Sequence, residues 1–249
     1  MMLEACLNGA RRPVDHPALP VTASQLAGDA ARVVEAGADA VHVHVKDAEG
    51  ADTLSDRALA DVLSAVRESA PGLPVGVTTG AWAEPDPEER VAAVRSWTAL
   101  PDFASVNWHE PGAEAVAAAL LNRGVGVEAG LWHAAAVDTW LRSPLRDRCF
   151  RVLLELPDGP ERGVAAASDE LLALLGIDDR GRTGSGVPVL LHGEGDSAWA
   201  ALRHAARRGL ATRIGLEDAL VLPDGTPAPD NAALVRAARE LLTGRSPRA

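Results

Sequence analysis

Eight short apolar segments, rich in β-branched residues, alternate along the chain with segments of helical periodicity. Apolar side chains in the helical segments recur every three or four residues, as Leu59, Val62 and Val66 do. Thr22 and Ser55 are expected helix N-caps, and glycines stand where helices should end. The expected strands are residues 3–7, 40–45, 74–78, 103–107, 125–128, 152–155, 187–192 and 212–214.

Eight strand–helix units in 249 residues match the count and the length of a (β/α)8 TIM barrel. We therefore expect a single α/β domain over residues 1–249. A doubly wound open sheet is the alternative, but no Gly-x-Gly-x-x-Gly fingerprint follows the first strand. In a barrel of this kind the active site lies at the C-terminal strand ends and in the loops that follow them.

The composition favours a soluble enzyme that acts on small molecules. A net charge of −11 disfavours nucleic acid and anionic membranes as partners. The chain is 47% apolar, yet no stretch approaches the ~18 uninterrupted apolar residues of a membrane span. The first residues predict a strand rather than a signal peptide, and Cys6 and Cys149 are expected to be buried thiols. These features predict a cytoplasmic location.

Polar side chains gather at the expected C-terminal strand ends, whereas the strand starts are almost wholly apolar or small. Packing alone does not explain why a barrel is polar only at the C-terminal ends of its strands, so we expect this ring of side chains to line an active site. The members of the ring are Asn8, Arg11, His42, His44, Thr78, Thr79, Ser105, Asn107, Glu110, Glu128, Glu155, His192, Arg213, Glu217 and Asp218.

His42 and His44 alternate with valines, so both imidazoles share one face of the second strand. Two imidazoles at this spacing can bind one divalent cation. Glu217 is the best candidate for a third ligand, because the eighth strand closes beside the first, which pairs with the second. Two histidines and a carboxylate suit zinc, with iron(II) or manganese as alternatives.

Asp218 follows the expected metal ligand directly and is then free to carry protons. The metal and Arg213 would set its pKa. The alternative interpretation is that Glu217 and Asp218 form a solvated acidic pair that opens the last loop.

Several short motifs follow one another in the order known from one enzyme family. They are Asn8-Gly9-Ala10-Arg11, His16-Pro17-Ala18-Leu19-Pro20-Val21-Thr22, Ala36-Gly37-Ala38, His42-Val43-His44-Val45-Lys46-Asp47, Thr78-Thr79-Gly80, Ser105-Val106-Asn107, Arg213-Ile214-Gly215-Leu216-Glu217-Asp218 and Asp230-Asn231-Ala232-Ala233-Leu234-Val235. In these segments, over nearly its whole length, the chain resembles the β-keto acid cleavage enzymes. The prototype of that family cleaves 3-keto-5-aminohexanoate.

The resemblance implies a zinc-containing barrel that forms a homo-oligomer, a tetramer or a dimer. It also implies condensation of a β-keto acid with acetyl-CoA, which gives acetoacetate and a new acyl-CoA. At the matching positions, His42, His44 and Glu217 would bind zinc, and Arg213 and Asp218 would form an acid–base assembly. The implied substrate-binding residues are Asn8, Arg11, Thr78, Thr79, Ser105 and Asn107.

The chain departs from the prototype at two positions. Arg11 stands where the prototype has an acidic residue, which favours a substrate with a neutral or anionic side chain. Gly130 stands where the prototype has a glutamate that assists the Asp–Arg pair. Glu128, on the same strand face two residues earlier, is the first candidate to replace it as a catalytic acid, with Glu110 and Glu155 as alternatives.

Two other functions stay open at this point. Hydrolases of the amidohydrolase kind also carry a His-x-His on a barrel strand, but they add histidines from strands five and six. Here those strands offer Glu128 and Glu155. A non-catalytic metal-binding barrel is the third possibility, and the intact Arg213 and Asp218 argue against it.

Three further features have more than one interpretation. The tryptophans after strands three to five suit an apolar acyl pocket or simple packing at the rim. Glycines around Glu194 could let backbone N–H groups meet a phosphate, although a carboxylate is a poor neighbour for one. Glu4, low on the first strand and facing inward, indicates a buried polar network.

Overall fold

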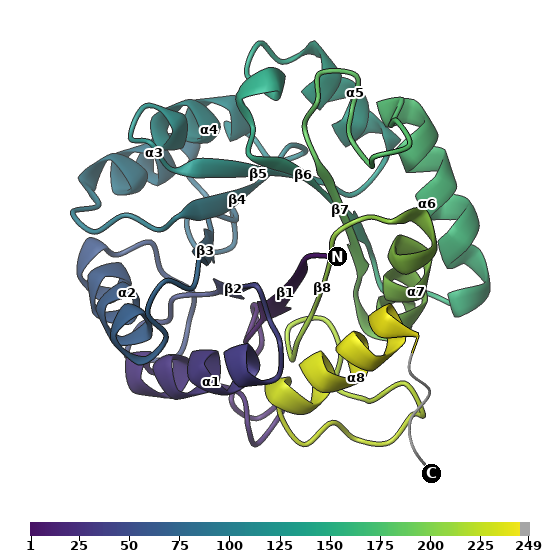
Figure 1. Cartoon of the computed structure of the whole chain (residues 1–249). Coiled ribbons are helices and arrows are strands. Elements are labelled where there is room, and N and C mark those ends of the chain that lie inside the picture. The colour runs from purple at the N-terminus through teal and green to yellow at the C-terminus, as the bar shows by residue number, and fades with distance from the viewer. Residues whose placement is uncertain (245–249) are drawn as a thin grey trace.

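Eight parallel strands form a ring that is surrounded by helices (Figure 1). The structure is a computed structural model that describes residues 1–244. The expected barrel is therefore confirmed, and residues 245–249 of the expected domain lie outside the described residues. The strands are β1 (Leu3–Cys6), β2 (Ala40–Val43), β3 (Val75–Thr78), β4 (Phe103–Asn107), β5 (Gly126–Leu131), β6 (Arg151–Leu156), β7 (Val189–Gly193) and β8 (Thr212–Ile214).

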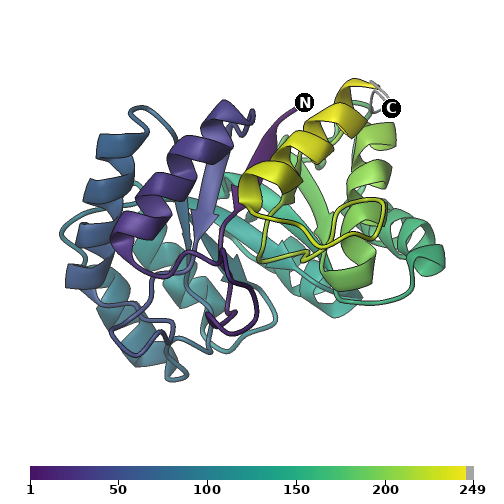
Figure 2. The same cartoon turned by 90° about the horizontal axis from the view of Figure 1, so that it is seen from below.

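The helices lie outside the strands, and α1 and α8 pack side by side (Figure 2). One α-helix follows each strand, with short 3₁₀ turns at Arg146–Arg148 and Gly195–Ser197. The α-helices are α1 (Ala23–Glu35), α2 (Asp56–Ser69), α3 (Pro87–Ser96), α4 (Ala113–Leu121), α5 (Ala134–Arg142), α6 (Glu161–Leu175), α7 (Ala198–Arg208) and α8 (Asn231–Thr243).

Local signals in the sequence start and stop these helices as expected. The Thr22 hydroxyl accepts a hydrogen bond from the Gln25 backbone N–H, and the Gln25 side chain accepts one from the Thr22 N–H, which forms a capping box. Ser55 caps α2. Gly209 ends α7 at a φ of 69°, a left-handed conformation that glycine adopts without steric cost.

The barrel closes between β7 and β8. The sheet runs in the order β7-β6-β5-β4-β3-β2-β1-β8, and a parallel bridge from Leu190 to Ala211 joins its two ends. The Thr212 hydroxyl donates a hydrogen bond to the Leu191 carbonyl oxygen at 2.8 Å across this junction. On its other side β8 pairs with β1, which pairs with β2, so the loop after β8 lies next to these two strands, as the proposed position of Glu217 requires.

Two strands are longer than their sequence patterns predict, and β6 extends one residue beyond its expected range at each end. β5 continues to Leu131, beyond the expected end at residue 128, because Ala129, Gly130 and Leu131 pair with the neighbouring strands. Glu128 therefore lies low in the barrel and not at its mouth. There it is fully buried and forms an ion pair with Arg151, which also pairs with Glu4.

This ion-paired group corrects the expectation that the strand starts are almost wholly apolar. It also confirms the polar network that Glu4 indicated. In residues 1–244, no helix is long and apolar enough to cross a membrane.

Candidate metal-dependent active site

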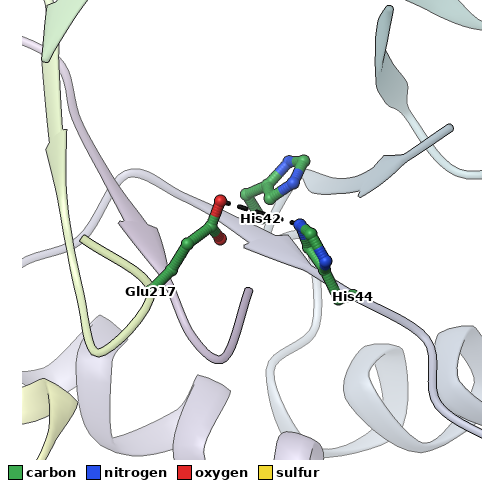
Figure 3. A group of neighbouring side chains, drawn as sticks. All are labelled: His42, His44 and Glu217. Carbon is green, nitrogen blue, oxygen red and sulfur yellow. Dashed lines mark ion pairs between the residues drawn. The ribbon is translucent and has the colours of Figure 1, made fainter. Parts of the chain in front are cut away.

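His42 and His44 are buried at the end of β2, and Glu217 approaches them from the loop after β8 (Figure 3). One potential ligand atom from each of the three residues lies within 4.8 Å of the others. The His44 Nε2 is 3.6 Å from the Glu217 Oε1. The structure thus brings together the three side chains that the sequence singles out as metal ligands.

Two glycines allow this approach. A Cβ on Gly215 would lie 1.8 Å from the carbonyl oxygen of Cys6, so only glycine lets the end of β8 lie this close to β1. Gly9 has a φ of 55°, and a Cβ there would lie 2.5 Å from the Glu217 Cγ. Both positions hold the glutamate against the histidine pair.

The donor set fits a divalent cation. The His42 Nδ1 and the Glu217 Oε2 are buried and have no hydrogen-bond partner among the described residues. Burial lowers the pKa of His42 to about 3, which leaves a neutral imidazole with a free lone pair. Although burial favours the neutral acid, Arg213 and the two histidines hold the pKa of Glu217 well below its usual range. A neutral imidazole and an ionised carboxylate are the forms that bind zinc.

Asp52 holds the second histidine in place. The His44 Nδ1 is 2.7 Å from the Asp52 Oδ2, so the other ring nitrogen faces Glu217. The Trp82 Nε1 donates to the same carboxylate at 2.7 Å, its ring stacks on His44 at a centroid distance of 5.9 Å, and Lys46 pairs with Asp52. A carboxylate behind a ligating histidine is common in metal sites, because it fixes the ring orientation and the tautomer.

Arg213 connects the candidate metal centre to a second buried group. Its Nη2 donates to the Glu217 Oε1 at 2.9 Å and to the Asp218 Oδ1 at 3.1 Å, and its Nε donates to the His192 Nδ1 at 3.2 Å. The Cys6 thiol donates to the other Asp218 oxygen at 2.7 Å. Burial acts to raise the pKa of Asp218, but Arg213 and His192 outweigh it and lower this pKa below its ordinary value.

A cavity of about 410 Å³ opens over these groups. His42, His44, Glu217 and Arg213 line it. The predicted substrate-binding residues that line it are Arg11, Thr78, Ser105 and Asn107. The cavity also contains Trp82, Trp132, Glu155 and Glu194.

Four predicted site residues, Asn8, Thr79, Asp218 and Glu128, do not line the cavity. The Asn8 amide accepts from the His44 N–H and donates to its carbonyl oxygen, and the Thr79 hydroxyl donates to the Ser105 carbonyl oxygen. These two side chains hold the backbone that carries other site residues. Asp218 is fully buried behind Arg213.

The glutamate candidates differ in their surroundings. Glu128 belongs to the ion-paired group at the base of the barrel, and Glu110 is bound by Arg90 and by the Asn107 amide. Of the three acids considered, Glu155 is the one that lines the cavity. Its Oε2 lies 3.5 Å from the His192 Nε2.

Sequence reasoning missed Asp52 and Lys46 as parts of the site. Asp52 follows His44 by eight residues, and no periodicity connects the two. The contact forms because the loop folds back on itself through paired backbone hydrogen bonds between Asp47 and Ala51 and between Val45 and Thr53. A turn signal was present at Gly50, but it does not specify which side chain reaches the histidine.

The fold and the site define a (β/α)8 barrel with two histidines and a carboxylate facing one cavity at its mouth. The sequence model for "beta-keto acid cleavage enzyme" matches residues 1–247, and the chain belongs to this family. Membership and the homologue described next indicate an enzyme that cleaves β-keto acids.

Two characterised relatives are similar in sequence. The 3-keto-5-aminohexanoate cleavage enzyme of Acetoanaerobium sticklandii is 23% identical over 250 residues, which cover 94% of this chain and 89% of that enzyme. The 3-oxoadipate:acetyl-CoA acetyltransferase of Cupriavidus necator is 36% identical over 69 residues, which are 28% of this chain and 24% of that enzyme.

Solved structures of ObcA share the fold. A binary complex of ObcA with oxaloacetate matches with a TM-score of 0.72, and a ternary complex with a C4-CoA adduct and oxalate matches with a TM-score of 0.69. Each is 20% identical in sequence, and the match covers 92% of this chain. The chain spans 64% of the length of ObcA.

Proposed function

We propose that this protein exchanges acyl groups between a β-keto acid and acetyl-CoA. The keto acid R–CO–CH2–COO⁻ and CH3–CO–SCoA would give acetoacetate, CH3–CO–CH2–COO⁻, and the new thioester R–CO–SCoA. The observation that carries the proposal is the juxtaposition of His42, His44 and Glu217 with Arg213 in one cavity, in a chain of this family. The acetyltransferase named above and the CoA adduct and oxaloacetate in the ObcA complexes support the choice of substrates.

The metal in this proposal is zinc, held by His42, His44 and Glu217, with iron(II) or manganese as alternatives. A bound zinc ion would polarise the β-carbonyl of the substrate and offset the negative charge of an enolate.

Side chains of the cavity would bind and orient the keto acid. The hydroxyls of Thr78 and Ser105 and the amide of Asn107 are donors that suit its carboxylate. Arg11 would face the variable group R, which favours a neutral or anionic one. Arg213 keeps a positive charge at the reacting end and, together with Asp218, forms the acid–base assembly of the proposal.

The test is an incubation of the purified protein with acetyl-CoA and a mixed panel of β-keto acids, with and without a chelator. Mass spectrometry would detect new acyl-CoA species together with acetoacetate. We expect product only in samples that retain metal. A hydrolase would instead consume the keto acid without acetyl-CoA, and a non-catalytic barrel would give no product although it carries metal.

A substitution of the proposed third ligand, compared with a control substitution, tests the metal centre. Glu217→Ala should lose both the metal and the product, whereas Glu161→Ala, which changes an exposed glutamate on α6, should keep both. Metal binding by Glu217→Ala as tight as in the wild type would contradict the proposed centre.

A further inference from the structure

Four carboxyl groups crowd one side of the active site, where β6, β7 and the loop after β8 meet. They are Glu155 at the end of β6, Glu194 directly after β7, and Glu217 and Asp218 after β8. We call these four residues the acidic wall. Close carboxylates cannot all remain ionised at low cost unless cations balance them.

Arg213 and His192 are partners for three members of the acidic wall. Arg213 donates to both Glu217 and Asp218, at 2.9 and 3.1 Å. His192 lies 3.5 Å from Glu155. Within residues 1–244, the carboxyl group of Glu194 has neither an ion pair nor a hydrogen bond, although it faces the cavity.

The backbone holds Glu194 firmly in this position. Its N–H donates to the Leu156 carbonyl oxygen at 3.0 Å, and its carbonyl oxygen accepts from the Ser197 hydroxyl at 2.7 Å and from the Ser197 N–H at 3.0 Å. The next residue, Gly195, donates its N–H to the Asp218 carbonyl oxygen at 2.8 Å. These contacts fix the backbone of Glu194, whose side chain lines the cavity.

Asp218 is in the opposite situation. It is fully buried, does not line the cavity, and accepts hydrogen bonds from Cys6 and Arg213. Its position suits it to hold Arg213 rather than to meet a substrate.

We propose that Glu194 is a further catalytic residue of this site, which exchanges a proton with the α-carbon of the keto acid beside the Arg213–Asp218 pair. This inference rests on the proposed function. The ionised Glu194 takes a proton from the CH2 group, and the electron pair of the C–H bond stays in the enolate. The α-carbon of the enolate then bonds to the acetyl carbon, and the CoA thiolate leaves. The thiolate bonds to the R–CO carbon as the bond from that carbon to the α-carbon breaks, and the electron pair of that bond stays in the enolate of acetoacetate. The same proton returns to this α-carbon, which becomes the CH2 group of acetoacetate. No proton is gained or lost overall.

The electrostatic surroundings of Glu194 suit this role. Burial, together with Glu155, Asp218 and Glu217, raises its pKa to about 8, while His192 acts in the opposite direction. The neighbouring Asp158 accepts a hydrogen bond from the Asp196 N–H, and neither of these two acids supplies a positive charge that would lower the pKa of Glu194. A proton carrier works best when its pKa lies near the working pH.

The experiment follows one half of the reaction without CoA. Acetoacetate is mixed with the zinc-loaded protein in D2O, and NMR measures how fast deuterium enters its CH2 group. Titration calorimetry on the same samples measures the affinity for acetoacetate. We expect Glu194→Gln to slow the exchange by about 10²- to 10⁴-fold, the usual contribution of general acid–base catalysis, with less than a threefold change in affinity. Asp196→Asn, an exposed acid two residues away, is the matched control and should exchange at the wild-type rate.

Three results would overturn the inference, and they differ from one another. Wild-type exchange in Glu194→Gln would show that another group carries the proton. A loss of affinity that accounts for the whole loss of rate would make Glu194 a binding residue only. If the wild-type protein does not exceed the spontaneous exchange rate, the proposed function itself fails, and the role of Glu194 fails with it.

Discussion

At the scale of single residues, the environment of each histidine sets its role. His42 is neutral because burial lowers its pKa to about 3. His44, although equally buried, has carboxylates on both sides, and Glu217 and Asp52 raise its pKa to about 9 against the effect of burial. The Asp52 contact fixes which nitrogen of His44 faces the cavity.

Removing the charge of Asp52 should therefore weaken metal binding. We expect Asp52→Asn to lower the affinity for zinc by about 10- to 100-fold, the usual effect of changing a carboxylate behind a ligating histidine. Chelator competition measures this affinity. Glu49→Gln, an exposed acid in the same loop, should bind zinc as the wild type does. Equal affinities for the wild type and Asp52→Asn would show that the contact does not hold the ligand.

Glu194 gives a prediction about stability. Its pKa is raised from 4.5 to about 8 in the folded protein, so the folded state binds this proton more tightly than the unfolded state does. The free energy of unfolding should then fall as the pH rises from about 4.5 to about 8. In metal-free protein, Glu194→Gln removes this loss.

We expect Glu194→Gln to be more stable than the wild type by up to about 4 kcal/mol at pH 8, and by less than about 1 kcal/mol at pH 5. Urea unfolding at the two pH values measures the difference. If Glu194→Gln leaves the free energy of unfolding unchanged at both pH values, Glu194 is ionised without cost in the folded protein. The neighbouring carboxylates would then not raise its pKa.

At the scale of elements, the junction of β1 and β8 positions the proposed metal ligand Glu217 beside His42 and His44. Gly215 allows the two strands to meet, since a Cβ there would lie 1.8 Å from the Cys6 carbonyl oxygen. The sequence motif around Glu217 predicted that this residue is the third metal ligand. The expected order of the strands predicted that it lies near His42 and His44. The need for glycine at this position could not be read from one sequence, because it depends on how closely two strands approach.

Gly215→Ala should force β1 and β8 apart, displace Glu217 and destabilise the protein by more than about 2 kcal/mol. Gly163→Ala is the control, because Gly163 lies in α6 and an added Cβ meets nothing within 4 Å. Alanine there should stabilise the protein by up to about 1 kcal/mol. Zinc affinity and urea unfolding check both variants, and tight zinc binding by a stable Gly215→Ala protein would contradict this account of the junction.

The length of β5 shows where sequence reasoning reached its limit. The prediction ended the strand at residue 128 and placed Glu128 at the barrel mouth, whereas the strand continues to Leu131. Ala129, Gly130 and Leu131 are small or apolar residues that suit a strand, but Gly130 is also a strong signal for a turn. Pairing with β4 and β6 decides between the two, and pairing is a property of the folded barrel.

At the scale of the whole molecule, the barrel has a polar base as well as a polar mouth. Arg151 pairs with Glu4 and Glu128 and stacks on Phe103, with its guanidinium carbon 4.9 Å from the ring centroid. This group joins β1, β5 and β6. The sequence indicated the fold, the mouth and a polar network at Glu4, but the partners of Glu4 come from strands far along the chain.

Arg151→Met should destabilise the protein by about 3–5 kcal/mol, because two buried carboxyl groups lose their cation. Burial already raises the pKa of Glu4 to about 7 with Arg151 present, so the loss should be smaller at pH 5, where protonation removes the charge. The triple variant Glu4→Gln, Glu128→Gln, Arg151→Met should regain much of the stability in urea unfolding. A triple variant as unstable as the single one would show that packing, not charge, dominates at the base.

Other whole-molecule expectations from the sequence, a homo-oligomer and a cytoplasmic location, stay predictions. The central claim is that the acetyl group of acetyl-CoA becomes part of acetoacetate while a new acyl-CoA forms.

The most direct measurement supplies acetyl-CoA with both acetyl carbons labelled by ¹³C, together with unlabelled β-keto acids, and locates the label by NMR. The account predicts acetoacetate labelled at C3 and C4, the CH3–CO half, in amounts equal to the new acyl-CoA. Consumption of keto acid while the label stays in acetyl-CoA would contradict the claim and indicate hydrolysis instead.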